Sequence, residues 1–180
     1  MKFLKVLARG PDVINTSFID ACLETGKVPD ITKYHLRDKV NEEKFGITME
    51  QSVSRARAHR HGLLRGTPIY CTADIKNGVD SYKAIAEANG AHFTVYRARS
   101  GTTIRPTTAE EDGNAPPEPV YLISGTLPAE KILWARFEEM ARNGHMEPRI
   151  VAADWLLDVA MAQNLFFEER YLVPNFYKQA

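Results

Sequence analysis

Short apolar runs alternate with a helical spacing of apolar positions in the second half of the chain. The runs at residues 68–71, 92–96 and 120–124 have the length of strands and are bounded by turn-forming residues. Between the first two runs, apolar side chains recur every three or four positions from about residue 80 to an Asn-Gly stop, which predicts an amphipathic helix. Strands that alternate with helices in this way predict an α/β fold.

The chain also contains an internal repeat. Residues 11–23 align with residues 148–160 without a gap, at a constant offset of 137 positions. Each copy predicts a short apolar strand, a polar or small cap residue, and then a helix that carries an aromatic residue, Phe18 or Trp155. Because the aromatic residue recurs at the same place, we interpret it as a core residue rather than a ligand platform.

The similarity extends upstream, where Phe3 and Phe137 align at an offset of 134 within helices that end at a glycine. The second copy then reads strand, helix, strand, strand, helix, strand, helix, whereas the first copy shows only its last helix, strand and helix. We therefore assign residues 1–40 to the C-terminal part of a first repeat, 41–66 to a linker and 67–175 to a complete second repeat.

By this comparison, roughly 70 residues of the first repeat would precede Met1. If the first repeat instead docks as a fragment, the apolar side chains of Phe3, Leu4 and Leu7 should be exposed. In the linker, residues 48–51 form a capping box that opens a helix, and such a helix can pack across both repeats. The segment 97–119, rich in Thr, Glu, Gly and Pro, is predicted to be a long mobile loop.

Composition excludes several classes of protein. The 23 basic residues balance 23 acidic ones, so net charge indicates no affinity of the whole chain for nucleic acid. No apolar run is long enough to span a membrane, and the first residues lack the pattern of a signal peptide, which favours the cytosol or nucleus. Cys22 and Cys71 lie in apolar runs without metal-binding spacing, and we interpret both as reduced core residues.

Catalytic motifs do not occur in the sequence. It has no nucleotide-binding glycine loop, no zinc-binding helix pair and no nucleophile elbow, and its five histidines are dispersed. We therefore expect neither an enzyme nor a metal or cofactor site.

Two segments, residues 2–10 and 43–57, narrow the interpretation. Together with Trp155 and the repeat, they resemble the tandem BRCT fold, and in particular the C-terminal BRCT pair of the mediator of DNA-damage checkpoint and of fungal genome-integrity scaffolds. The resemblance covers the chain from Met1 to about Val173. It implies a small parallel sheet flanked by helices in each repeat.

The resemblance also implies a function. Members of this family are nuclear adaptors of the DNA-damage response that bind a phosphoserine near a protein C-terminus, typified by the damage-phosphorylated histone tail. Other DNA-repair proteins are further expected partners, and no membrane is involved.

Site residues follow from the resemblance position by position. Lys2 matches the lysine that holds the phosphate, while the family's Ser/Thr-Gly pair and its arginine would lie before Met1. A groove between the repeats takes the residue three places after the phosphate, and its matching positions are Leu4, Asn77, Gly78, Ala153 and Asp154. Because Ala153 stands where relatives often carry a basic residue, this groove should be less positively charged than theirs.

Other interpretations of the same residues remain open. Lys2 can be an ordinary solvated lysine, and the repeats can bind a partner without phosphate. DNA binding, which we consider unlikely, would use the basic cluster of the linker, Arg55, Arg57, His59, Arg60, His61 and Arg65. A weak second anion site is conceivable at Thr72-Ala73, with Arg136 near the lysine position of the second repeat.

Overall fold

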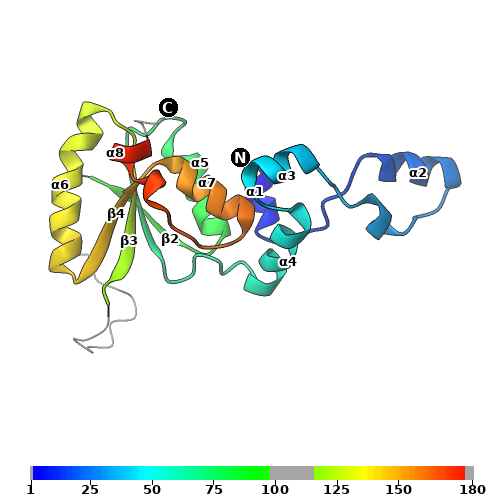
Figure 1. The fold of residues 1–180 in the computed structure, drawn as a ribbon, viewed down its shortest axis with the longest axis horizontal. Helices are drawn as coiled ribbons and strands as arrows, with labels where there is room; N and C mark the ends of the chain where they lie inside the picture. Colours follow the sequence, from blue (N-terminus) through cyan, green and yellow to red (C-terminus); the bar gives the residue numbers. More distant parts are fainter. Residues whose placement is uncertain (1, 98–115, 177–180) are drawn as a thin grey trace.

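The structure is a computed structural model that describes residues 2–97 and 116–176. Its centre is a four-stranded parallel sheet in the order β2-β1-β3-β4 (Figure 1). The three strands predicted from apolar runs are confirmed, as is the strand of the second repeat copy. The strands are β1 (Pro68–Thr72), β2 (His92–Tyr96), β3 (Glu118–Ile123) and β4 (Met146–Val151).

Helices cover both faces of this sheet. On one face lie α5 (Val79–Ala88) and α7 (Ala153–Ala162), and on the other lies α6 (Pro128–Asn143) (Figure 1). Successive residues of β3 point to opposite faces, so Tyr121 packs with α5 and α7 whereas Leu122 packs with α6. The predicted α/β fold is therefore confirmed for the second repeat.

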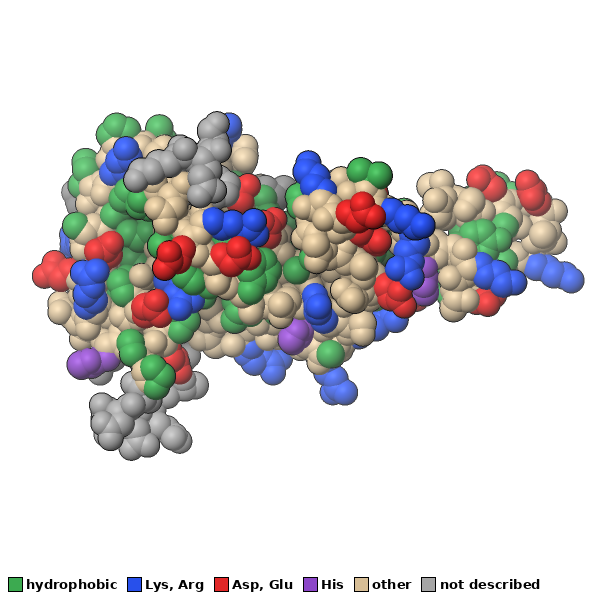
Figure 2. All heavy atoms as spheres, in the orientation of Figure 1, with side chains coloured by type: hydrophobic (Ala, Val, Ile, Leu, Met, Phe, Trp, Pro, Cys, Tyr) green, Lys and Arg blue, Asp and Glu red, His purple; other side chains and the backbone are tan. Residues whose placement is uncertain are grey.

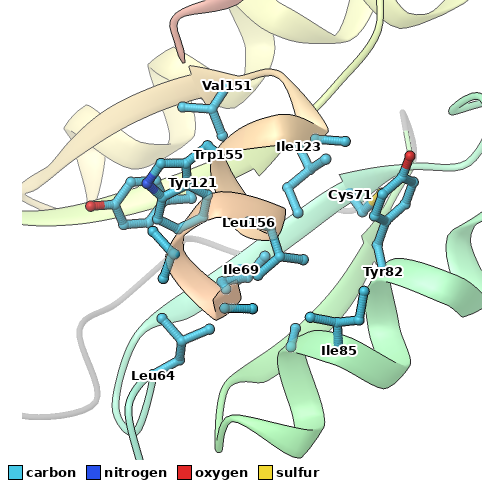
Figure 3. Packing of buried hydrophobic residues seen from close by; sticks show 14 of the residues in the cluster. Leu64, Ile69, Cys71, Tyr82, Ile85, Tyr121, Ile123, Val151, Trp155 and Leu156 are labelled. Carbon is cyan, nitrogen blue, oxygen red and sulfur yellow. The ribbon is translucent and has the colours of Figure 1, made fainter. Parts of the chain in front are cut away.

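Trp155 is confirmed as a core residue. Its side chain is fully buried and stacks on Tyr121 with ring centroids 4.0 Å apart (Figure 3). The indole Nε1 donates a hydrogen bond of 2.9 Å to the carbonyl oxygen of Phe166, which satisfies the only polar atom of the side chain.

The first half of the chain is helical in the structure. Before the sheet, the elements are α1 (Lys2–Leu7), α2 (Ser17–Thr25), η1 (Ile31–Tyr34), α3 (Lys39–Phe45) and α4 (Met49–His59). Two short elements follow the sheet helices at the C-terminal end, η2 (Glu169–Tyr171) and α8 (Val173–Phe176). Figure 1 shows α2 at the end of the molecule farthest from the sheet.

The internal repeat is visible in the backbone pairing. Ile14 forms an isolated antiparallel bridge with His35, and Val151 forms the same bridge with Leu172, 137 positions later in both partners. The predicted strand of the first copy is wrong, however, because Ile14 makes this single bridge and has no neighbouring strand among the described residues.

Phe18, the counterpart of Trp155, is also not the buried core residue that the repeat predicts. It is half-buried, and its ring makes a T-shaped contact with that of Tyr34, with centroids 5.5 Å apart. The next positions on the same helix, Ile19 and Leu23, are 57% and 78% exposed. The difference arises because α7 packs on the sheet, whereas α2 has no sheet beside it in the part that the structure describes.

Helix α1 packs against α5 and α7 of the second repeat. Leu4 and Leu7 are therefore buried, which contradicts the expectation for a docked fragment, while Phe3 is 39% exposed. The turn after α1 needs Gly10, which has φ +63° and no room for a Cβ, since that atom would lie 2.5 Å from Cγ of Arg57.

The linker helix α4 is confirmed, and it contacts both α1 and α7. At its N-terminus Thr48 Oγ1 accepts a hydrogen bond of 3.2 Å from the backbone of Gln51. The boundaries assigned to the two repeats and the linker remain a prediction.

The two cysteines differ in their surroundings. Cys71 is fully buried, as predicted, whereas Cys22 is only half-buried because α2 lies away from the core. Most of the predicted loop 97–119 falls on residues 98–115, which lie outside the described residues.

Candidate functional site

Lys2 is the first residue of α1 and its side chain is exposed. Its ammonium group makes no hydrogen bond or ion pair with any other described residue. An exposed lysine without a partner is available to an anionic ligand, although the same is true of many surface lysines.

Two of the predicted groove residues, Leu4 and Ala153, lie in one hydrophobic cluster. Leu4 on α1 is 7% exposed and Ala153, the first residue of α7, is 9% exposed. Ile75 and Tyr82 belong to the same cluster. Helix α1, which contacts α5 and α7, therefore shares its hydrophobic core with both helices.

The loop between β1 and α5 supplies the next two groove residues. Asn77 and Gly78 both have positive φ angles, +71° and +80°, which turn the chain sharply before α5. The Asn77 amide donates to the hydroxyl of Tyr82 at 3.4 Å, and that hydroxyl donates to the Lys76 carbonyl at 3.2 Å. Asn77 is thus tied to the cluster through Tyr82, while Gly78 is exposed.

Asp154 lies in the first turn of α7, exposed, where the positive end of the helix dipole stabilises a carboxylate. Leu4 and Ala153 thus belong to the same core cluster, and Asn77 is linked to that cluster through Tyr82. The structure shows no hydrogen bond or ion pair between the side chain of Lys2 or Asp154 and the other predicted site residues among those it describes.

The basic cluster of the linker is partly used within the fold. Arg57 donates to the Gly10 carbonyl at 2.7 Å and to Asp12 at 2.8 Å, and its guanidinium lowers the pKa of Asp12. Arg55 donates to the Ala162 carbonyl at 3.1 Å. These two arginines connect α4 to both halves of the molecule.

Surface charge gives the DNA-binding interpretation little support. Figure 2 shows basic and acidic side chains interspersed over the visible face, without a field of one sign. Two of the six basic residues of the linker, Arg55 and Arg57, are already used within the fold, where each donates to a backbone carbonyl.

The second anion site considered at Thr72 is wrong for an external ligand. The Thr72 hydroxyl is buried and donates a hydrogen bond of 2.6 Å to the carboxylate of Glu130. Sequence reasoning missed Glu130, because its position three residues into α6 indicates only a helix-capping role.

The described residues offer no cluster of three His, Cys, Asp or Glu side chains that could hold a metal ion. None of the described helices is long and apolar enough to cross a membrane. Cavities of about 280 and 240 Å³ lie beside α4, and neither is lined by a residue predicted to hold the phosphate or the peptide.

Comparison with known proteins agrees with this architecture. Residues 1–36 match the family model of the BRCT domain of regulator of Ty1 transposition protein 107. BRCT-containing protein 1 of Schizosaccharomyces pombe is 28% identical over 174 residues, which is 94% of this chain and 19% of that protein. The crystal structure of the S. pombe Brc1 BRCT5-BRCT6 domains matches with a TM-score of 0.66 and 26% identity, over 91% of this chain and 73% of that one.

This chain has the tandem BRCT fold and is homologous to Brc1. A second BRCT relative, the DNA damage response protein Mdb1 of S. pombe, is 26% identical over 110 residues, 57% of this chain and 17% of its own. The chain spans about a fifth of the length of these curated relatives. The complex of Rtt107p with a phosphorylated histone shares the fold, with a TM-score of 0.63 at 18% identity over 96% of this chain and 70% of that one.

Proposed function

We propose that this chain is part of a phosphopeptide-binding adaptor of the nuclear DNA-damage response, and not an enzyme. Its proposed ligand is a phosphoserine near a protein C-terminus, such as a damage-phosphorylated histone tail. One observation carries the proposal. Helix α1, which bears Lys2, packs against α5 and α7 of the second BRCT repeat.

The fold of the relatives supports this assignment. The Rtt107p structure contains a phosphorylated histone and has the same tandem arrangement as this chain. Brc1 is a BRCT-containing protein and Mdb1 is a DNA damage response protein, and both are homologues of this chain.

The chemistry of a phosphate suits Lys2. A phosphoserine carries close to two negative charges at neutral pH, and a lysine ammonium supplies both charge and hydrogen-bond donors. Each charge-assisted hydrogen bond contributes about 1.5 to 3 kcal/mol, so a few of them and one apolar contact reach roughly micromolar affinity, near 8 kcal/mol. Such affinity is reversible, as a damage signal requires.

The groove residues suit the part of the ligand that follows the phosphate. Leu4 and Ala153 are apolar residues of one cluster, and Asn77, which is linked to that cluster through Tyr82, supplies polar backbone and side-chain atoms. Asp154 adds a negative charge, and therefore a peptide with a basic or neutral group there should bind better than one with an acidic group.

The test is a titration of phosphorylated and unphosphorylated copies of one C-terminal histone peptide into a protein that carries the complete first repeat. We expect binding of the phosphorylated copy alone. Equal affinity for both copies would instead support a phosphate-independent interaction module. Binding of duplex DNA with a steep salt dependence would favour the basic linker as the functional surface.

A further inference from the structure

The carboxylate of Glu130 is buried in the second repeat, with 1% of the residue exposed. Its Oε1 accepts hydrogen bonds from the Thr72 hydroxyl at 2.6 Å and the Gly125 backbone amide at 2.8 Å. Its Oε2 accepts from the Leu127 backbone amide at 3.0 Å. The carboxylate is therefore surrounded by donors that converge from the end of β1, the loop after β3 and the N-terminus of α6.

A capping role explains only one of these bonds. A glutamate three residues into a helix commonly reaches back to the N-cap amide, as Glu130 does to Leu127. The bonds from Thr72 and Gly125 are tertiary, and Thr72 lies 58 residues away in the sequence. Without Glu130 the Gly125 amide would lose this partner, and the buried Thr72 hydroxyl would keep only a longer bond of 3.5 Å to the Ile123 carbonyl.

Gly125 shows that the backbone approaches the carboxylate closely. A Cβ at this position would lie 2.6 Å from Oε2 of Glu130, so any side chain here would require the carboxylate to shift. Close backbone approach through glycine is a feature of loops that cradle phosphate and other anions.

Charge in the surroundings points the same way. The pocket lies at the N-terminus of α6, a helix of 16 residues, whose dipole favours an anion there. The neighbouring thiol of Cys71 has its pKa raised, first by burial and then by the negative charge of Glu130.

We propose that Thr72, Gly125 and Leu127 form an oxyanion site that the chain fills with its own Glu130. The second repeat therefore holds an internal carboxylate and takes no external phosphate. The ligand class of the site is a small planar or tetrahedral oxyanion. Glu130→Ala would remove a methylene group and the carboxylate, which leaves space for an anion as small as formate.

Chemical rescue of a shortened side chain tests the site. Glu130→Ala should lower the melting temperature by on the order of 10 °C, because the buried Thr72 hydroxyl and two partly buried backbone amides lose their acceptor. Sodium formate, compared with sodium chloride at equal ionic strength, should then raise the melting temperature saturably. The melting temperature of Glu139→Ala, at an exposed position of the same helix, should respond to formate like that of the parent. The double variant Glu130→Ala/Thr72→Val should lose much of the formate response.

Inorganic phosphate in place of formate measures how large an oxyanion the site accepts. If Glu130→Ala is unfolded in chloride, formate should restore its far-ultraviolet circular dichroism. The proposal would be overturned if formate and chloride gave the same melting temperature or, for an unfolded variant, the same circular dichroism. Glu130→Gln, which leaves the pocket filled, should not respond to formate, and a response equal to that of Glu130→Ala would locate the anion elsewhere and also overturn it.

Discussion

Lys2 and Lys5 are exposed lysines on one short helix, and only Lys2 matches the phosphate-binding position of the BRCT family. Replacing Lys2 with glutamate puts a negative charge where the phosphate is proposed to bind. In a protein with the complete first repeat, Lys2→Glu should weaken phosphopeptide binding at least tenfold, or by about 1.4 kcal/mol. Isothermal titration measures this effect directly.

The matched control is Lys5→Glu, which makes the same charge change on the same helix and should bind nearly as well as the parent. Lys2→Glu should also melt at the parent temperature, because a carboxylate in the first turn of a helix is mildly favourable. Undiminished binding by a folded Lys2→Glu protein would remove Lys2 from the site.

Trp155 and Phe18 occupy equivalent positions of the two repeats but are buried to different degrees. Trp155→Ala removes a fully buried ring and should lower the free energy of unfolding by about 3 to 5 kcal/mol. Phe18→Ala removes a half-buried ring and should cost about 1 kcal/mol. Urea denaturation of both variants provides the comparison, and equal losses would contradict the difference in packing.

Cys71 gives the protein a sensitivity to alkaline pH. Burial and the charge of Glu130 raise the pKa of its thiol from 9.0 to about 12. Between these values the unfolded chain loses the thiol proton while the folded chain keeps it, so stability is full below pH 9 and falls as pH rises. The contribution is at most about 1.4 kcal/mol per pH unit.

Buried tyrosines titrate in the same direction at higher pH, since the pKa of Tyr121 is also raised by burial. The informative interval is therefore about pH 9 to 10, and the control is Cys71→Ala. Urea denaturation over this interval should show a steeper loss of stability for the parent than for Cys71→Ala. Identical slopes would mean that the thiol does not titrate as its burial indicates.

At the scale of elements, sequence patterns predicted those helices and strands that depend on the short-range spacing of apolar residues. Strand β1 and helix α5 have apolar residues at strand and helix periods, so both were predictable. Ile14 has the same local pattern as Val151 but forms no strand, because a strand also requires a neighbour to pair with.

The candidate site was less predictable for the same reason. The family resemblance placed Leu4 and Ala153 at a shared groove, and the structure puts both in one cluster. Contacts between distant residues, such as Thr72 with Glu130, leave no periodic signal in a sequence, and so that pocket was found only in the structure.

The linker helix joins the two halves of the chain through two arginines. Arg57→Ala removes the bonds to Gly10 and Asp12 and should lower the melting temperature by about 3 °C. The effect is modest because half of the Arg57 side chain is exposed. Arg60→Ala, at the exposed end of the same helix, should melt within about 1 °C of the parent by comparison.

At the scale of the whole molecule, burial is distributed unevenly along the chain. The two hydrophobic clusters draw their residues from α1 and from the chain beyond residue 62, and α2 contributes none. The second repeat together with α1 is therefore the stable unit, while α2 at the far end of the molecule depends on local interactions (Figure 1).

Native-state hydrogen exchange should separate these two parts. Helix α2 has nine residues and no buried side chain, and an isolated helix of this length is marginal in water. Its amides should therefore exchange through local opening, far faster than those of α7, which should exchange only on global unfolding. Equal protection of α2 and α7 would show that the chain unfolds as one unit.

The exposed Ile19 and Leu23 on α2 have a consequence for how this end of the molecule acquires its order. A surface that covers them would add the burial that α2 lacks, and the free energy of binding would then include the formation of the helix. Association at this end should consequently show a larger negative heat-capacity change than rigid docking of the same surface, because folding and contact would occur in a single step.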